Sequence, residues 1–164
     1  MKKLLFLLVF STSISVTYAQ LKGKVDCPEI VVDILKGRVN GIKPDVPFVE
    51  MKQQLSCYTF TSVPESDSAK CGGGLFFKDK DIFFYTRRDY IEIGEKFKGK
   101  LNVPLMGATR ASMFSKFGNP KVKDRTWDAF QTQYGTLVIY YNTANKVNKL
   151  QFSTLSTETL SLCE

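Results

Sequence analysis

Alternating apolar and polar positions predict β-strands along most of this chain. In the segment 147–154, Leu150 and Phe152 alternate with Lys149 and Gln151, so the two pairs point to opposite faces of a strand. Other segments rich in β-branched and aromatic residues, each bounded by turn residues, predict strands near 30–36, 57–62, 74–78, 82–87, 90–97, 126–134 and 136–142. Turn-like residues between neighbouring strands favour hairpins, which makes the predicted sheet antiparallel.

Two short segments have helical periodicity instead. From Asp45 to Leu55, apolar residues recur at i, i+3 and i+7. From Thr109 to Gly118, they recur at i, i+1 and i+4. Asp45 and Thr109 are predicted helix caps, and Gly118 is a predicted helix end. Helices of about ten residues are not stable alone in water, so their apolar stripes are expected to pack on the sheet.

The chain also contains an internal sequence similarity. Residues 35–55 resemble residues 97–117 at a shift of 62 positions. Four pairs are identical across this shift, Lys36/Lys98, Gly37/Gly99, Asn40/Asn102 and Met51/Met113. A duplicated small unit usually builds one surface from two halves. We therefore expect an α+β fold of two tandem repeats, 20–89 and 90–164, each made of a strand, a helix and a three-stranded meander. The short helices are expected on one face of an antiparallel sheet.

The second half carries a motif that resembles a known superfamily. Gly107 and Thr109 precede the predicted helix, Gly118 and Pro120 follow it, and a hairpin of aromatic strands ends near Phe152. This pattern resembles the small outer-membrane lipoproteins and the β-lactamase-inhibitory proteins. In the two-copy inhibitors, the resemblance implies helices on one side of a curved sheet whose other side grips a protein. It implies envelope assembly for single-copy members, and in both cases a binding module rather than an enzyme.

Aromatic residues are too dense in the predicted strands for one core. Consecutive aromatics at 76–77, 83–85 and 140–141 break the alternation expected of a strand with one wet face. Some rings must therefore lie on the face away from the helices, unless both faces are buried. If the face bearing Leu137 and Ile139 meets the helices, the opposite face carries the candidate partner-binding residues. These are Phe76, Phe83, Tyr85, Arg87, Tyr140, Lys149 and Gln151. Aromatic residues and arginines are typical of protein-binding surfaces.

Residues 1–19 have the pattern of a secretory signal peptide. Lys2 and Lys3 precede a short apolar run, and a small-residue cleavage site ends at Ala19. The apolar run is shorter than the roughly 20 residues needed to span a membrane. We expect cleavage after Ala19, export to the periplasm or the medium, and no stable membrane insertion. The formal charge of +7 comes without a clustered basic stripe, so no nucleic-acid partner is expected.

The cysteine count predicts disulfides. The four cysteines are Cys27, Cys57, Cys71 and Cys163, an even number in a chain expected to be exported. Three pairings are possible. The preferred pairing joins Cys57 to Cys71 across a short loop rich in Ser, Asp and Gly, and joins Cys27 to Cys163. A zinc site would need closely spaced cysteine pairs, which the sequence lacks.

No catalytic motif stands out. The sequence contains no histidine, which removes Ser-His-Asp and Cys-His nucleophiles and histidine-ligated metals. Glu92 and Glu95 are better explained as solvated strand-end charges than as an acid/base pair. We expect no cofactor, no metal and no catalytic residue. The leading hypothesis is an exported protein-binding module, in its sharpest form an inhibitor or immunity protein. An envelope assembly factor is the alternative, and a carboxylate-dependent enzyme is a remote one.

Overall fold

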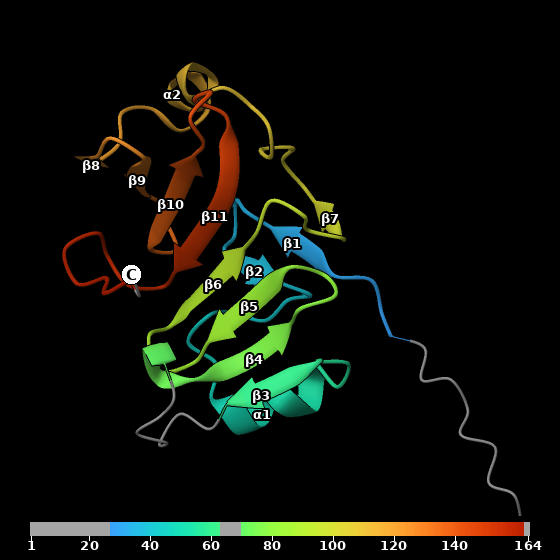
Figure 1. The fold of residues 1–164 in the computed structure, drawn as a ribbon. Helices are drawn as coiled ribbons and strands as arrows, with labels where there is room; N and C mark the ends of the chain where they lie inside the picture. Colours follow the sequence, from blue (N-terminus) through green and yellow to red (C-terminus); the bar gives the residue numbers. More distant parts are fainter. Residues whose placement is uncertain (1–26, 63–69, 163–164) are drawn as a thin grey trace, which may run out of the picture.

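An eight-stranded antiparallel sheet organises the chain (Figure 1). A computed structural model describes residues 27–62 and 70–162; the predicted signal peptide lies outside them. In sheet order the strands are β3 (Phe60–Ser62), β4 (Gly74–Phe77), β5 (Ile82–Tyr85), β6 (Tyr90–Ile93), β11 (Val147–Ser153), β10 (Thr136–Tyr141), β9 (Trp127–Gln131) and β8 (Val122–Lys123). The fold is therefore α+β with a mainly antiparallel sheet, as predicted.

The second layer covers one face of this sheet. It consists of α1 (Phe48–Gln54), α2 (Arg110–Phe117) and a small sheet of β2 (Arg38–Val39), β1 (Val31–Asp33) and β7 (Lys100–Leu101). In this small sheet β1 pairs antiparallel with β2 and parallel with β7. Figure 1 shows α1 and α2 at opposite ends of the molecule, with the small sheet between them. A short 3₁₀ turn, η1 (Lys70–Gly72), precedes β4.

The helix ends agree only in part with the predicted caps. Thr109 is the N-cap residue of α2, although its side chain makes no capping hydrogen bond. Gly118 ends α2 with a φ of 77°, a conformation that favours glycine. The predicted cap at Asp45 is wrong, because the cap position of α1 is Pro47, whose fixed φ suits the entry to a helix.

One core lies between the two layers. The large sheet contributes the alternate residues of its strands, and the covering layer contributes Val32, Val39, Met51 and Met113, all fully buried. The sheet residues of this core are Leu75, Phe77, Ile82, Phe84, Ile91, Ile93, Phe130, Leu137, Ile139, Tyr141, Val147, Leu150 and Phe152. The alternation predicted for 147–154 is thus confirmed for Leu150 and Phe152, because both belong to the core.

The strand order is symmetric about the pair β6–β11. One side reads β3-β4-β5-β6 and the other reads β8-β9-β10-β11, so each meander has four strands rather than the predicted three. The elements β7, α2 and β8 begin 62 positions after β2, α1 and β3. A duplicated unit would produce this arrangement, and the duplication stays a prediction. Since β6 forms a hairpin with β5, a division after β6 follows the pairing better than the predicted division before Tyr90.

The preferred disulfide pairing is wrong. Cys27 is bonded to Cys57, with Cα atoms 5.7 Å apart. The register Phe60↔Phe76 and Ser62↔Gly74 puts positions 57 and 71 beyond opposite ends of the β3–β4 pair, too far apart for the short reach of a disulfide. Cys71 is also disulfide-bonded, and the remaining cysteine in the sequence, Cys163, lies outside the described residues.

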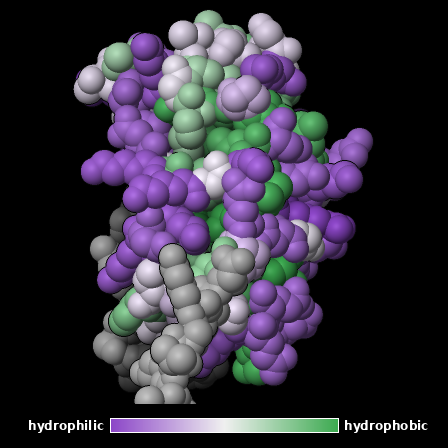
Figure 2. All heavy atoms as spheres, turned by 90° about the vertical axis from the view of Figure 1, so that its right-hand side faces the viewer, coloured by the Kyte–Doolittle hydropathy of each residue, from purple (hydrophilic) through white to green (hydrophobic). Residues whose placement is uncertain are grey.

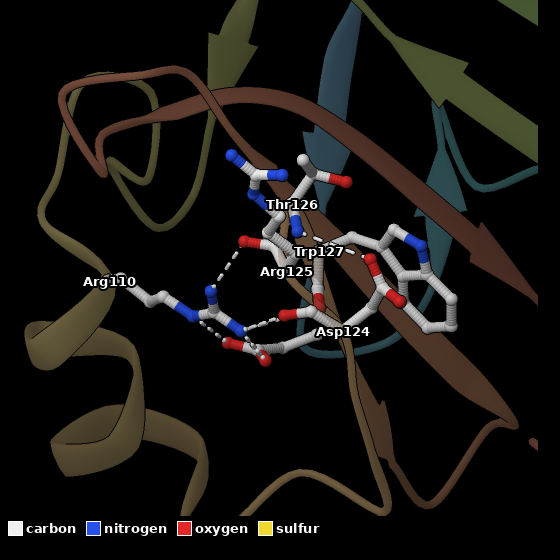
Figure 3. Close-up of polar contacts among 6 residues, drawn as sticks. Arg110, Asp124, Arg125, Thr126 and Trp127 are labelled. Carbon is white, nitrogen blue, oxygen red and sulfur yellow. Dashed lines mark hydrogen bonds and ion pairs between the residues drawn. The ribbon is translucent and has the colours of Figure 1, made fainter.

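Arg110 joins α2 to the large sheet (Figure 3). Its Nε donates to Asp128 Oδ2 at 2.9 Å, and its Nη2 donates to the other carboxylate oxygen. Two further hydrogen bonds reach the backbone carbonyls of Arg125, at 3.0 Å, and Asp124, at 2.6 Å. A cation in the first turn of a helix is unfavourable for the helix dipole, so the fully buried Asp128 carboxylate explains why it is tolerated there.

The Cys27–Cys57 bond should contribute measurably to stability. Replacing both cysteines, as Cys27→Ser with Cys57→Ser, opens a loop of 30 residues. The entropy released to the unfolded chain is expected to lower the free energy of unfolding by about 3–4 kcal/mol. Urea denaturation of the wild type and the double variant measures this difference. Identical unfolding midpoints would contradict the assignment.

Arg110→Ala should destabilise the protein strongly. The substitution leaves the Asp128 carboxylate, which is 0% exposed, without its counter-charge. We expect the free energy of unfolding to fall by about 3–5 kcal/mol. Arg125→Ala is the matched control, because it removes an exposed guanidinium while keeping the backbone carbonyl that Arg110 binds. Equal urea midpoints for the two variants would show that the contacts of Arg110 with Asp128 do not stabilise the fold.

Candidate protein-binding face of the sheet

The face of the large sheet away from the helices, here called the open face, carries one row of residues that crosses all eight strands. Successive cross-strand pairs define this central row as Phe60, Phe76, Phe83, Glu92, Gln151, Val138, Ala129 and Val122. None of these residues belongs to the core between the layers. The register therefore brings residues from both halves of the chain onto one surface.

The character of the central row changes along its length. On the β3 side it consists of three phenylalanines, and Phe60 is 49% exposed. At the join of the two meanders it becomes polar, with Glu92 and Gln151. On the β8 side it continues with Val138 and Ala129, both buried. Only the β3 side of this row thus offers aromatic surface.

The rings on this side form an aromatic cluster, defined as Phe60, Phe76, Phe83, Tyr85 and Tyr90. The centroid of Phe76 lies 5.7 Å from that of Phe60, 5.9 Å from that of Phe83 and 5.7 Å from that of Tyr85. Tyr85 stacks on Tyr90 with centroids 4.6 Å apart. Among the described residues, Phe60 is the one aromatic side chain in the class of exposed large hydrophobics. Mutual ring contacts hold the cluster rigid, which lowers the entropy lost on binding.

A polar network adjoins the aromatic cluster. The Tyr140 hydroxyl donates to Gln151 Oε1 at 2.9 Å, and Gln151 Nε2 donates to Glu92 Oε2 at 2.6 Å. Lys149 Nζ lies 3.6 Å from Glu92 Oε2 and 4.0 Å from the ring centroid of Tyr140. The Trp127 ring is 6.4 Å from that of Tyr140. The network fixes the side chains of β6, β11, β10 and β9 relative to one another.

The C-terminal segment, residues 154–162, covers one end of the open face. It begins where β11 ends, and its backbone accepts a hydrogen bond from Thr136 Oγ1 at Leu155 O, 2.8 Å away. Further along, Arg88 Nη1 donates to Leu162 O at 3.0 Å, which ties the segment to the β5–β6 turn. Near this turn, Tyr90 is only 1% exposed although it points away from the core between the layers, and its ring stacks on that of Tyr85.

Six of the seven candidate residues lie on strands of the open face. Phe76, Phe83 and Tyr85 belong to the aromatic cluster, and the other three strand residues belong to the polar network. Gln151 is 1% exposed, so it orients its neighbours rather than offering contact surface. Arg87 lies apart in the β5–β6 turn, where its side chain packs over Gly72.

Sequence reasoning missed Phe60, Lys78 and the structural role of Glu92. Lys78 Nζ lies 4.7 Å from the ring centroid of Phe60, a cation–π contact on the β3 edge. The hairpin turn at 78–81 could have placed Phe83 opposite Phe76, but the partner of β3 across the intervening loop has no local signal. The sequence predicts a solvated Glu92, whereas its carboxylate is hydrogen-bonded in the network.

The described residues do not assemble a metal site. Within residues 27–62 and 70–162, no group of three or more cysteine, aspartate or glutamate side chains could hold a metal ion. Glu92 is engaged with Gln151 and Lys149, and Glu95 is exposed beyond the end of β6. Neither of the described α-helices is long and apolar enough to cross a membrane.

Comparison with known proteins adds no relative. No family model matches the chain, and neither the curated proteins nor the solved structures contain a match. The functional argument therefore rests on the surfaces of this molecule. The side shown in Figure 2, which carries β1 and β7, presents hydrophobic patches between hydrophilic side chains.

Tyr85 gives the aromatic cluster a pH dependence. Burial, and next the Glu92 carboxylate, raise the pKa of Tyr85 to about 12 from 10.0. Because the pKa of Tyr85 is higher in the folded state than in the unfolded state, its neutral phenol stabilises the fold at pH values below 10. This stabilisation is lost as the pH rises from 10 to 12. Urea unfolding across this window should show the wild type losing more stability than Tyr85→Phe. Parallel stability curves for the two proteins would contradict this assignment.

Proposed function

We propose that this protein is an exported, non-enzymatic binding module whose open face docks onto another protein. The observation that carries the proposal is the partly exposed aromatic cluster, which sits on a rigid sheet beside an ordered polar network. Rigid aromatic residues surrounded by polar groups are the usual composition of protein-binding hot spots. The resemblance to inhibitory proteins with a gripping sheet face points in the same direction.

The charges around the aromatic cluster favour a partner with an acidic rim. Lys78 lies over Phe60 at the edge of the sheet, and Lys149 lies over Tyr140 at the other side of the cluster. The acidic Glu92 between them is already satisfied by Gln151 and Lys149. A complementary acidic partner would be steered toward this face, with an association rate that falls as salt is added.

Export is supported by two features. The N-terminal pattern of residues 1–19 is that of a signal peptide, and the chain carries the Cys27–Cys57 disulfide, a bond typical of oxidising compartments. In this setting, the sharpest form of the proposal is an inhibitor or immunity protein that blocks a secreted enzyme or toxin sterically. An exposed aromatic surface on a rigid sheet suits steric blocking.

The test compares capture by surface variants. The purified protein and its variants are used as bait for proteins of the native envelope and medium, with quantification by mass spectrometry. Phe60→Ala and Phe83→Ala should each reduce capture of the partner at least about tenfold, because they truncate anchor rings of the aromatic cluster. Thermal unfolding should change little for Phe60→Ala, since its ring is half exposed.

Val49→Ala is the matched control. Val49 is 66% exposed on α1, in the layer that covers the opposite face of the sheet. A protein captured equally by the wild type and by Val49→Ala, and lost with Phe60→Ala, supports docking on the open face. Capture that survives both phenylalanine substitutions overturns the proposal. An enzyme or toxin as the partner identifies an inhibitor, whereas an outer-membrane assembly component identifies the envelope role.

A further inference from the structure

A second surface, unconnected with the aromatic cluster, has the construction of a small-ligand site. An open pocket with a volume of about 790 Å³ lies where β9, β10 and β11 meet the β10–β11 turn. Its lining residues are Arg125, Thr126, Tyr141, Asn142, Thr143, Asn145 and Asn148. The lining side chains end in hydroxyl, amide, methyl or guanidinium groups, and none of these residues carries a carboxylate. The volume falls in the range of small-molecule sites.

The hydrogen bonds of Arg110 hold one wall of the pocket in place. By binding the carbonyls of Asp124 and Arg125, Arg110 fixes the turn that carries Arg125 and Thr126, as Figure 3 shows. The guanidinium carbon of Arg110 also lies 4.8 Å from the ring centroid of Tyr141. The turn with Arg125 and Thr126 and the ring of Tyr141 are thus both held by the buried ion pair of Arg110 and Asp128.

The opposite wall is the β10–β11 turn, which is equally well held. Asn142 Oδ1 accepts hydrogen bonds from the backbone N–H groups of Ala144 and Lys146, each at 3.0 Å. The Arg110 N–H donates to Asn145 O at 2.9 Å, which joins the turn to the start of α2. Both walls are therefore ordered without a ligand, and such preorganisation lowers the entropy cost of binding.

One buried polar atom at this pocket lacks a partner. Asn148 Oδ1 makes no hydrogen bond with any described residue. Asn148 is the extra residue of a bulge, because Tyr140 pairs with Lys149 and Tyr141 pairs with Val147. Bulges re-aim side chains and occur often beside functional sites. A buried polar atom without a partner costs free energy unless a ligand or a water molecule binds it.

The Tyr141 hydroxyl is engaged with Asp128. Burial raises the pKa of Tyr141, and its hydrogen bond with the Asp128 carboxylate raises it further. Asn148 Oδ1 is an acceptor only. A ligand that binds this atom must therefore donate a hydrogen bond, which a sulfate dianion cannot do. A hydroxyl group donates, and it also accepts from the amide and guanidinium groups of the lining.

We propose that this pocket binds a polyhydroxylated ligand, a single sugar ring. A ring hydroxyl would donate to Asn148 Oδ1, while Arg125, Thr126 and the turn asparagines contact the remaining hydroxyls. This inference does not rest on docking of a protein to the open face, since the pocket and the aromatic cluster share no residue.

The test is a titration followed by amide NMR. The purified protein is titrated separately with glucose, galactose, N-acetylglucosamine and glucuronate, into the millimolar range typical of weak ligands. At least one sugar should shift the Asn148 side-chain amide and the backbone amides of Arg125 and Thr126 in a saturable way. Asn148→Ala should weaken that binding about tenfold or more. Thr126→Val, which keeps the backbone of the turn, should weaken sugar binding as well. It provides the test if Asn148→Ala does not fold.

Two control variants establish that binding is specific to this pocket. Asn119→Ala removes an exposed asparagine in the α2–β8 loop and should leave sugar binding unchanged. Phe83→Ala should also leave it unchanged, so failure of sugar binding and failure of protein docking are distinguishable. The proposal is overturned if none of the four sugars gives saturable shifts, or if both pocket variants bind as tightly as the wild type. A crystal soaked in the best-binding sugar that shows only water at Asn148 would overturn it too.

Discussion

The pairing of β6 with β11 is the constraint on which the rest of the structure depends. These two strands join the two four-stranded meanders, with the register Ile93↔Leu150 and Glu92↔Gln151. The first pair points into the core and the second points to the open face. Because side chains alternate along a strand, a slip of one residue would exchange these faces. Buried Ile93 and Leu150 fix the register, and the Gln151–Glu92 hydrogen bond adds a polar link that fits this register.

The same register determines what each half contributes to the surface. With Glu92 opposite Gln151, the aromatic residues of β3, β4 and β5 continue in line with the polar and aliphatic residues of β9, β10 and β11. The open face is therefore one surface made from both halves of the chain. Its β3 side is aromatic and its β8 side is aliphatic, because the two halves contribute different residues to the same row.

Local sequence patterns predicted the helices and strands well. They did not predict which strands that are distant in the sequence pair with each other. Every strand of four or more residues lies within or near a segment whose alternation or composition indicated it, and both helices lie within their predicted segments. The two-residue strands β2, β7 and β8 were missed because two residues cannot show a period. The opposite faces of Leu150 and Gln151 were predicted correctly, since alternation is local.

The features that sequence reasoning missed are those that depend on chain segments far apart. The Cys27–Cys57 bond spans 30 positions, and loop composition favoured a shorter link that the β3–β4 register forbids. Arg110 and Asp128 belong to separate elements, so nothing local marked them as a pair. The pocket at Asn148 arises from a one-residue bulge, and the sequence KVNKL shows no sign of it.

The contrast within the aromatic cluster is the strongest structural reason to expect a partner. Tyr90 and Phe60 belong to the same cluster, yet Tyr90 is 1% exposed and Phe60 is 49% exposed. Tyr90 lies inside the sheet on β6, close to the turn that Arg88 ties to the C-terminal segment, whereas Phe60 lies open on an edge strand, where exposed apolar residues favour unwanted association. The short β3 strand and Lys78 above Phe60 limit that hazard without removing the ring from solvent. The aromatic cluster thus combines a buried ring, Tyr90, with an accessible ring, Phe60. The proposed docking requires an accessible ring of this kind.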